Sequence, residues 1–284
     1  MSSHFTATSL WPHGPLAPDA AVREVSASLR RPVATPAALE ATFLIAASAI
    51  AGLGQFAHVA VPTAAHLSPG AFWPAREGAT PPRALLLPPC RARAPSGEAP
   101  RVTGLWEHTC VELFIAASPP ATAAVAEDVA GDFEYWEVNA APVDGSWNVF
   151  RFTKYRDGMA EETALPGPVT VVTSPVTTLG GGTDADAPPL ALLRVVVTVP
   201  LPAPLAAAPE LAVGVSTVAV DAGIGTGGDA VPSPDAPAGD VRADRHTTYW
   251  AARHANPARP DFHDPRGFAL RVPRDAAAPS SEEL

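Results

Sequence analysis

The segment GLWEHTCVELFI (104–115) places a histidine, a cysteine and two glutamates in an otherwise apolar sequence. In a β-strand, successive side chains point to opposite faces. One face of this segment therefore carries Trp106, His108, Cys110, Glu112 and Phe114. A carboxylate between a cysteine and a phenylalanine is costly to bury unless a hydrogen-bond donor or a cation meets it. The pattern predicts a partner for Glu112 elsewhere in the chain.

Three later segments repeat this mixture of charged and aromatic residues: FEYWEVNAAP (133–142), GSWNVFRFTKYRDGM (145–159) and TTYWAARH (247–254). If the first two form a hairpin through APVDGS, one sheet face is expected to carry Glu112, Glu137, Asn139, Trp147 and Arg151. Arg151 is the predicted partner of Glu112, because its planar guanidinium can satisfy both carboxylate oxygens.

These residue types suit a carbohydrate site, in which an aromatic plane covers the apolar face of a sugar and polar groups bind its hydroxyls. The candidate planes are Trp106, Trp136, Trp147, Tyr155 and Trp250. The candidate polar groups are Glu112, Glu137, Asn139, Asn148 and Arg151, and the surrounding candidates are His108, Tyr249, His254 and His263. The competing interpretation is that the tryptophans are core residues and the charged groups form an internal network.

Other chemistry is conceivable with the same residues. Zinc would use His108 and Cys110 with His254 or His263, and calcium would use Asp144 or the aspartates at 261 and 264. Glu112 and Glu137 could form the acid and nucleophile pair of a glycoside hydrolase. The sequence has no nucleophile elbow, phosphate loop or metalloprotease helix, which favours a binding module over an enzyme. His108 and Cys110 lack a second close ligand pair for zinc, and the aspartates show no dedicated calcium-loop pattern, so we predict no metal and no cofactor.

In the segment HANPARPDFHDPRGF (254–268), two histidines and two aspartates lie within the eleven residues 254–264, around two prolines. Proline stiffens the chain, which favours an ordered loop over a tail. We expect this loop either to close over the sheet face that bears Arg151 or to form a hydrogen-bonded crossover whose side chains satisfy backbone groups.

Most of the ordered sequence reads as short strands rich in Val, Thr and aromatic residues. The predicted strands are 20–30, 39–47, 55–61, 104–116, 133–141, 146–155, 168–173, 190–199, 211–220, 247–253 and 267–272, with one short helix at 120–130. No helix of the length that a parallel crossover needs separates them. The predicted fold is therefore all-β, an antiparallel β-sandwich of jelly-roll or immunoglobulin-like type with Pro/Gly-rich loop insertions.

The 34 prolines of the 284 residues cluster in stretches that suit loops. We predict a flexible N-terminus (1–19), a single domain (20–274) and a flexible tail (275–284). Insertions are predicted at about 62–102, 117–132, 174–189 and 222–246. The first and last of these insertions are expected to be mobile and removable, because their composition buries too little apolar surface to offset ordering entropy.

The net charge of −10 and the single lysine, Lys154, argue against a nucleic-acid partner. The longest uncharged apolar run (41–54) is too short to span a bilayer, so no membrane association is expected. The N-terminal residues lack the pattern of a secretory signal, which predicts a cytoplasmic location. Cys90 and Cys110 permit one disulfide but indicate no disulfide framework.

The blocks GLWEHTCVELFI, YWEVN, WNVFRFTKYRDGM and YWAARH, with PDFHDPRGFALRV after them, resemble the bacterial DOMON-like family related to family-nine carbohydrate-binding modules. The resemblance implies a β-sandwich whose relatives bind sugars or, in the broader DOMON group, haem. We therefore expect a non-catalytic carbohydrate-binding-like module for a small-molecule or glycan ligand. A haem-binding or redox DOMON module is the alternative, although Met1 and Met159 are the only methionines available as haem ligands. A glycoside hydrolase-like enzyme is the third hypothesis.

Overall fold

The structure of the protein is a computed structural model. It describes residues 6–16, 20–32, 34–35, 37–47, 50–51, 83–86, 99–118, 133–142, 144–176, 191–223 and 245–274.

The described residues form fourteen strands, one α-helix and two 3₁₀ helices. The strands are β1 (Thr6–Pro12), β2 (Val22–Arg30), β3 (Ala38–Ala47), β4 (Ile50–Ala51), β5 (Arg83–Leu86), β6 (Cys110–Ala117), β7 (Tyr135–Ala140), β8 (Trp147–Phe152), β9 (Ala160–Glu161), β10 (Thr170–Val176), β11 (Ala191–Pro200), β12 (Glu210–Gly223), β13 (Arg245–Ala251) and β14 (Leu270–Pro273). The helices are η2 (Leu105–Glu107), α1 (Ala203–Ala207) and η3 (Pro265–Gly267).

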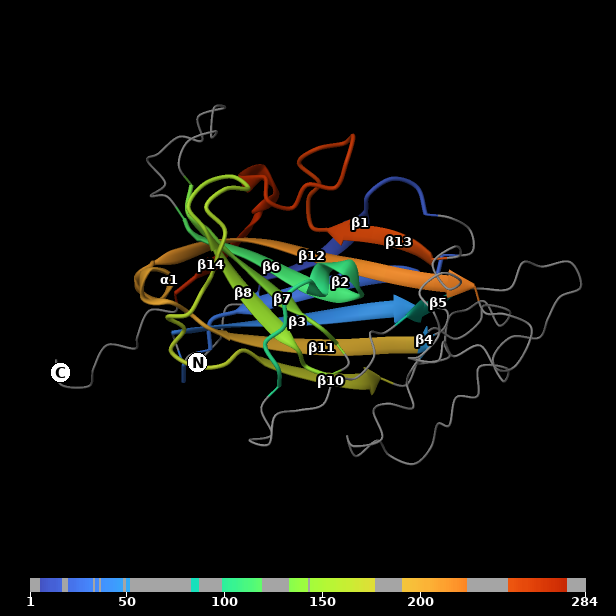
Figure 1. The fold of residues 1–284 in the computed structure, drawn as a ribbon, viewed down its shortest axis with the longest axis horizontal. Coiled ribbons are helices and arrows are strands. Elements are labelled where there is room, and N and C mark those ends of the chain that lie inside the picture. The colour runs from blue at the N-terminus through green and yellow to red at the C-terminus, as the bar shows by residue number, and fades with distance from the viewer. Residues whose placement is uncertain are drawn as a thin grey trace, which may run out of the picture.

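The strands join in one sheet of order β10-β11-β3-β2-β1-β13-β12-β6-β7-β8-β9 (Figure 1). The long strand β12 also pairs with β14 and β5, and β5 pairs with β4. Every described pairing between strands is antiparallel except that of β4 with β5. The predicted all-β, antiparallel class is confirmed.

Strand β1 makes the sheet continuous. Residues Thr6 to Leu10 pair with β2, and the next two residues, Trp11 and Pro12, pair with β13. The described strands thus belong to a single curled sheet, and the two separate sheets of the predicted sandwich are not shown.

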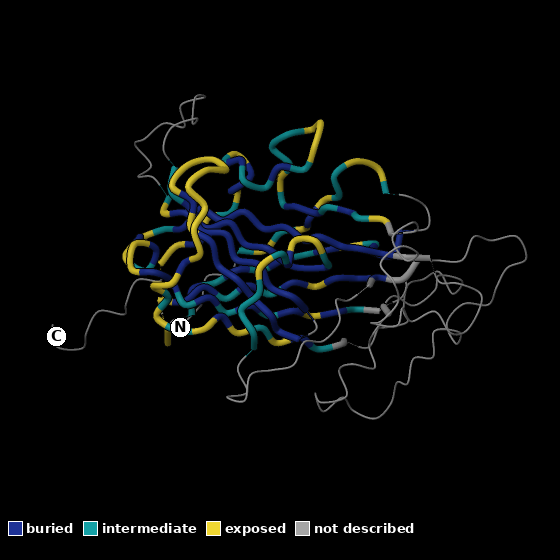
Figure 2. Tube along the Cα trace, viewed as in Figure 1, coloured by how far each residue is buried: buried dark blue, intermediate teal, exposed yellow. Residues whose placement is uncertain are grey.

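The main core lies between the two halves of the curled sheet. Phe43 of β3 and Leu193 of β11 belong to the same buried cluster as Leu113 of β6 and Val149 of β8. Strands from distant positions in the sheet order can share one cluster only if the sheet curls until its halves face each other. Figure 2 shows the buried residues running through the middle of the molecule.

Side-chain alternation explains which residues enter this core. In β11, Leu193, Val195 and Val197 are buried, whereas Arg194 between them is exposed. Strand β6 differs, because seven of its eight residues are buried. A strand covered on both faces loses the polar half of its alternation. A second layer must therefore cover the outer face of β6, which is the face turned away from the main core.

The ends of several predicted segments differ in the structure. The predicted strand 104–116 starts instead as η2 and becomes extended only at Cys110, so Trp106 and His108 precede the strand. Strand β1 lies within the predicted flexible segment 1–19, and β5 lies within the predicted insertion 62–102. The predicted strand 55–61 and helix 120–130 lie outside the described residues, as do 177–190, 224–244 and 275–284.

None of the helices formed by the described residues has the length and apolar character needed to cross a bilayer.

Candidate ligand site on the outer face of the sheet

The register of β12, β6, β7 and β8 determines which residues share the outer face. Directly opposed residues in neighbouring antiparallel strands point to the same face. One cross-strand row is Ser216, Glu112, Asn139 and Asn148. The next row is Gly214, Phe114, Glu137 and Phe150. Two acids and an amide therefore meet at the centre of this face, and we call Glu112, Glu137 and Asn139 the polar floor.

Apolar clusters lie on both sides of the polar floor along the strands. Toward one end, Phe114 packs with Tyr135, Phe152 and Phe268. Toward the other end, Cys110 packs with Val218, Val220 and Tyr249. The outer face thus has a polar band between two apolar ones, an arrangement that alternation alone does not produce.

Glu112 is buried and is held by neutral donors. The Ser216 hydroxyl donates to Oε2 at 2.6 Å, and the Cys110 thiol donates weakly to Oε1 at 3.6 Å. Burial raises the pKa of Glu112, and the two donors oppose that rise. Cys110 is a buried free thiol whose pKa is also raised, first by burial and then by the charge of Glu112.

The predicted pairing of Glu112 with Arg151 is wrong. Arg151 stands opposite Trp136 in the hairpin, on the face away from the polar floor, and its Nε donates to Glu134 at 2.6 Å. Its guanidinium carbon lies 5.8 Å from the centre of the Trp136 ring. A shift of one residue in register exchanges the two faces of a strand, so Asn148 and Phe150 take the places expected for Trp147 and Arg151.

Asn139 donates a hydrogen bond to one of the two acids and keeps one atom without a partner. Its Nδ2 donates to Glu137 Oε1 at 2.7 Å, while its Oδ1 is buried and accepts no hydrogen bond in the described part of the chain. Burial and the neighbouring Glu112 charge raise the pKa of Glu137 to about 7, although the Asn139 hydrogen bond favours the ionised form. The polar floor therefore contains an acceptor atom, Asn139 Oδ1, that receives no hydrogen bond from a donor in the described part of the protein.

His263 approaches the floor from the C-terminal loop. Its Nδ1 lies 2.8 Å from the Tyr135 hydroxyl, which also accepts from the Arg156 backbone N–H. The hydroxyl proton is thus free to be donated to Nδ1, which assigns the proton of a neutral His263 to Nε2. Nε2 faces Glu137 Oε2 at 3.8 Å.

This histidine and acid do not form an ion pair at neutral pH. Burial, followed by the charge of Arg156, lowers the pKa of His263 to about 4, so its imidazole is neutral. The distance of 3.8 Å also exceeds that of a hydrogen bond. Glu137 Oε2 consequently has no strong partner in the described structure.

Residues 252–269, which we call the covering loop, form the second layer over the floor (Figure 1, red, beside the yellow-green turn after β8). Asp261 fixes the loop by accepting from the Tyr155 hydroxyl at 2.5 Å and from Arg156 Nη2 at 3.0 Å. Arg156 has φ +53°, a conformation that is uncommon outside glycine. We call the contacts of Asp261 with Tyr155 and Arg156 the clamp. A strained backbone conformation persists only where the surrounding structure fixes it, so the strain at Arg156 indicates that the clamp is a fixed feature of the fold.

Gly214 lets the covering loop approach the sheet. A Cβ at this position would lie 3.2 Å from Phe268 Cδ1 and 3.4 Å from Phe114 Cβ. A larger residue would push the loop outward, because cores tolerate little added volume.

Trp106 forms the exposed rim of the site. Its ring is edge-on to Phe150 at 5.7 Å, and the residue is 38% exposed. On the same side of the sheet, Asn148 Nδ2 donates to the exposed Glu161 carboxylate at 3.1 Å, and Arg101 Nε donates to Asn148 Oδ1 at 2.7 Å. The rim thus combines an aromatic plane with polar groups.

The remaining predicted site residues lie elsewhere. Trp136, Trp147 and Trp250 are buried in the main core, so they present no plane at the surface, in agreement with the competing interpretation. His254 Nε2 lies 2.8 Å from the Trp11 carbonyl oxygen, and Tyr249 packs against Phe262 of the covering loop. His108 follows η2 and is half-buried.

The residues considered for metals and haem have other roles. Asp144 accepts from the Ser146 N–H in the turn after β7, and Asp264 caps η3 and binds Arg266. Within the described ranges, no group of three or more His, Cys, Asp and Glu side chains is arranged to hold a metal ion. Met159 is exposed in the segment between β8 and β9.

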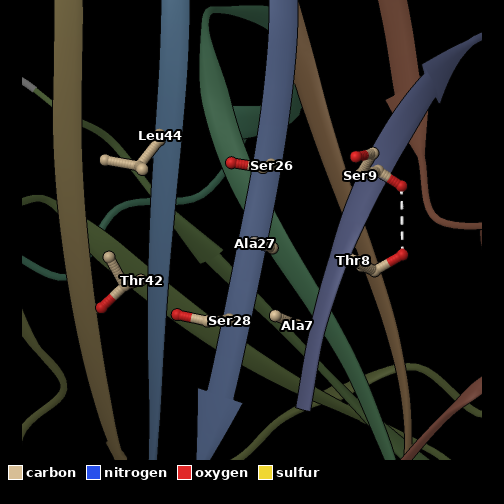
Figure 3. A pocket seen from close by; sticks show the side chains of 8 residues that line it. All are labelled: Ala7, Thr8, Ser9, Ser26, Ala27, Ser28, Thr42 and Leu44. Atoms are coloured by element: carbon tan, nitrogen blue, oxygen red, sulfur yellow. Dashed lines mark hydrogen bonds between the residues drawn. The ribbon is translucent and has the colours of Figure 1, made fainter. Parts of the chain in front are cut away.

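A separate hollow of about 450 Å³ lies on the other half of the sheet, over β1, β2 and β3 (Figure 3). Its lining residues are small or aliphatic: Ala7, Thr8, Ser9, Ser26, Ala27, Ser28, Thr42 and Leu44. The hollow reflects short side chains on neighbouring strands, and no charged or aromatic group lines it. We therefore favour the polar floor as the functional site, since it combines two buried acids, one with a raised pKa, with a buried Asn139 Oδ1 that has no partner in the described residues.

Sequence reasoning missed several residues that complete the site. Ser216 and Gly214 carry no local signal, because only the pairing of β12 with β6 brings them to the floor. Arg156 lies in the block WNVFRFTKYRDGM, but the sequence gives it no site role. The sequence suggests Asp261 only as a calcium ligand or a loop residue.

No protein-family model matches the chain, and no curated protein matches it. A crystal structure described as a "putative carbohydrate-binding protein" from Bacteroides uniformis ATCC 8492 is similar over 95% of this chain and 86% of that chain, with 12% sequence identity and a TM-score of 0.40. A similarity of this size carries no conclusion about function, so the function proposed below rests on the site itself.

Proposed function

We propose that the protein is a non-catalytic module that binds a small carbohydrate-like ligand over the polar floor. The observation that carries the proposal is a buried acceptor, Asn139 Oδ1, that has no hydrogen-bond partner in the described part of the chain and lies beside Glu137, whose Oε2 is 3.8 Å from His263 Nε2. Buried polar atoms are almost always hydrogen-bonded, so an exception calls for an explanation, and an absent partner molecule is one. A ligand rich in hydroxyl donors would complete these hydrogen bonds.

The surroundings of the floor suit a sugar better than a wholly apolar ligand. Trp106 offers a partly exposed ring for the C–H face of a pyranose, and the polar groups beside Asn148 lie within the same region. The sequence blocks that resemble the DOMON-like family contribute β6, β7, β8, β13 and the covering loop, which are elements that build this site.

A binding role accounts for the two acids better than hydrolysis does. Glycoside hydrolysis requires two carboxyl groups on opposite sides of the scissile bond. Glu112 and Glu137 instead stand on the floor of one sheet, on neighbouring strands, and Glu112 is engaged by Ser216 and Cys110. We therefore assign them to ligand recognition.

Ligand entry would require the covering loop to move, because Asn139 is fully buried and Glu112 and Glu137 are nearly so. Binding by loop displacement is common among small-ligand sites. The Asp261 clamp described above is the contact whose release would open the floor.

A thermal-shift screen with mono- and disaccharides tests the proposal. A ligand that prefers the native state must raise the melting temperature. We expect at least one saccharide to raise it, and we expect Trp106→Ala to weaken that saccharide's affinity at least several-fold. The matched control is Trp11→Ala, since Trp11 is an exposed tryptophan on β1, outside the strands that carry the polar floor. Failure of every saccharide, or a loss confined to Trp11→Ala, would overturn the proposal.

A further inference from the structure

We propose that the polar floor selects a sugar that carries a protonated amine over neutral and acidic sugars. This inference rests on the proposed function and deepens it. It is based on the geometry of three side chains that offer acceptors to the ligand: Glu112, Glu137 and the fully buried Asn139.

Most donors of the floor are already used inside the protein. The Ser216 hydroxyl and the Cys110 thiol both donate to Glu112, and one N–H of the Asn139 amide donates to Glu137. The remaining donors are the second N–H of the Asn139 amide and the Nε2–H of His263, which faces Glu137. A ligand therefore meets an environment that offers more acceptors than donors.

The cations around the floor are paired with other groups. Arg156 binds Asp261, which is almost fully buried, and Arg151 binds Glu134. Arg101 donates to Asn148 and to two backbone carbonyl oxygens. In the described part of the chain, no lysine or arginine forms an ion pair with Glu112 or Glu137.

The net charge that faces the ligand is consequently negative. The charge of Glu112 contributes to raising the pKa of Glu137 to about 7, so Glu137 is about half ionised at pH 7, and the exposed Glu161 adds a further carboxylate near the rim. The Tyr155 and Tyr135 hydroxyls and the His263 ring are neutral at pH 7. Two buried carboxylates without a cation are unfavourable, and a bound cation removes that penalty.

An ammonium group meets these requirements. It supplies three donors and one positive charge, which match two carboxylates and the free Asn139 Oδ1. A neutral hydroxyl would satisfy an acceptor but leave the charges uncompensated. A uronate would add a negative charge to the site.

Calorimetric titrations of the full chain at pH 7 test the inference with matched probes: glucosamine, mannosamine, the parent hexoses, N-acetylglucosamine and glucuronate. We expect the amino sugars to bind at least tenfold more tightly than their neutral counterparts, with glucuronate weakest. Glu137→Gln should reduce the preference to within about threefold, which is about 0.7 kcal/mol. Glu112→Gln serves as a second variant if Glu137→Gln does not fold.

The outcomes separate this inference from the proposed function. Neutral hexoses that bind as tightly as amino sugars, with no change in preference in Glu137→Gln, would overturn the amine selectivity while leaving sugar binding intact. Absence of binding by every sugar would overturn both. Amine preference in the wild-type chain that is lost in the glutamine variants would support both.

Discussion

At the scale of single residues, Glu137 and His263 are a buried acid and imidazole whose pKa values move in opposite directions. Burial raises the pKa of Glu137 from 4.5 to about 7 and lowers that of His263 from 6.5 to about 4. Each shift corresponds to about 3 kcal/mol at 1.36 kcal/mol per pKa unit. Both side chains are mostly buried, so the stability of the fold depends on these shifts.

The two groups predict opposing pH dependences. Between pH 4.5 and about 7 the folded form holds the Glu137 proton more tightly than the unfolded chain, so this group's contribution to stability falls as pH rises. Between pH 6.5 and about 4 the folded form resists protonation of His263, so its contribution falls as pH drops. In the wild-type chain the two slopes should largely cancel between pH 4.5 and 6.5.

Urea unfolding from pH 4 to 8 checks this cancellation. We expect His263→Gln to lose about 3 kcal/mol relative to wild type as pH rises from 4.5 to 7, and Glu137→Gln to lose a similar amount as pH drops from 6.5 to 4. Parallel pH profiles in the three proteins would show that neither group is desolvated as described.

Only some residues of the polar floor and their contacts can be predicted from the sequence. The sequence singles out Glu112, because a glutamate between Cys110 and Phe114 conflicts with an apolar strand, and it predicts Glu137 and Asn139 on the same face. The predicted partner of Glu112, Arg151, is wrong. Alternation defines the two faces of each strand, but it does not determine which face of one strand lies on the same side of the sheet as a given face of the next strand. Ser216 came from a strand about a hundred residues away and had no local signal.

At the scale of elements, the covering loop is the layer that buries the outer face. Phe262, His263 and Phe268 contact the aromatic residues of β6 and β7, and the loop is clamped by Asp261 to Tyr155 and Arg156. The prolines of the covering loop predict that it is ordered. The sequence does not predict the clamp, because Asp261 lies in a different segment from Tyr155 and Arg156, and side-chain alternation does not bring these segments together.

Asp261→Ala tests the role of the clamp. Removing a buried acceptor of two donors should cost about 1 to 3 kcal/mol and should speed hydrogen exchange of residues 252–269 about tenfold. Exchange in β3 and β11 should stay unchanged, because these strands belong to the other half of the sheet.

Glu134→Ala is the matched control for the clamp. It breaks the exposed ion pair with Arg151 and should cost under about 1 kcal/mol, with no effect on loop exchange. Equal acceleration throughout the chain in Asp261→Ala would contradict a local clamp.

At the scale of the whole molecule, one curled sheet presents two different outer faces. The half built from β12, β6, β7 and β8 carries the polar floor beneath the covering loop, and the half that contains β1, β2 and β3 carries the open hollow lined by serine and threonine. The strand content and antiparallel class followed from short segments rich in Val and Thr. The sequence does not predict that β1 connects the two halves of the sheet, because the first residues have a composition typical of a flexible end.

Hydrogen exchange of the full chain with and without a saturating saccharide tests whether the polar floor is the ligand site, because it locates the ligand on one of these two faces. We predict that the ligand protects backbone amides in the covering loop and in residues 104–112, with β1, β2 and β3 unchanged. Protection confined to β1, β2 and β3 would contradict the assignment of the polar floor as the ligand site.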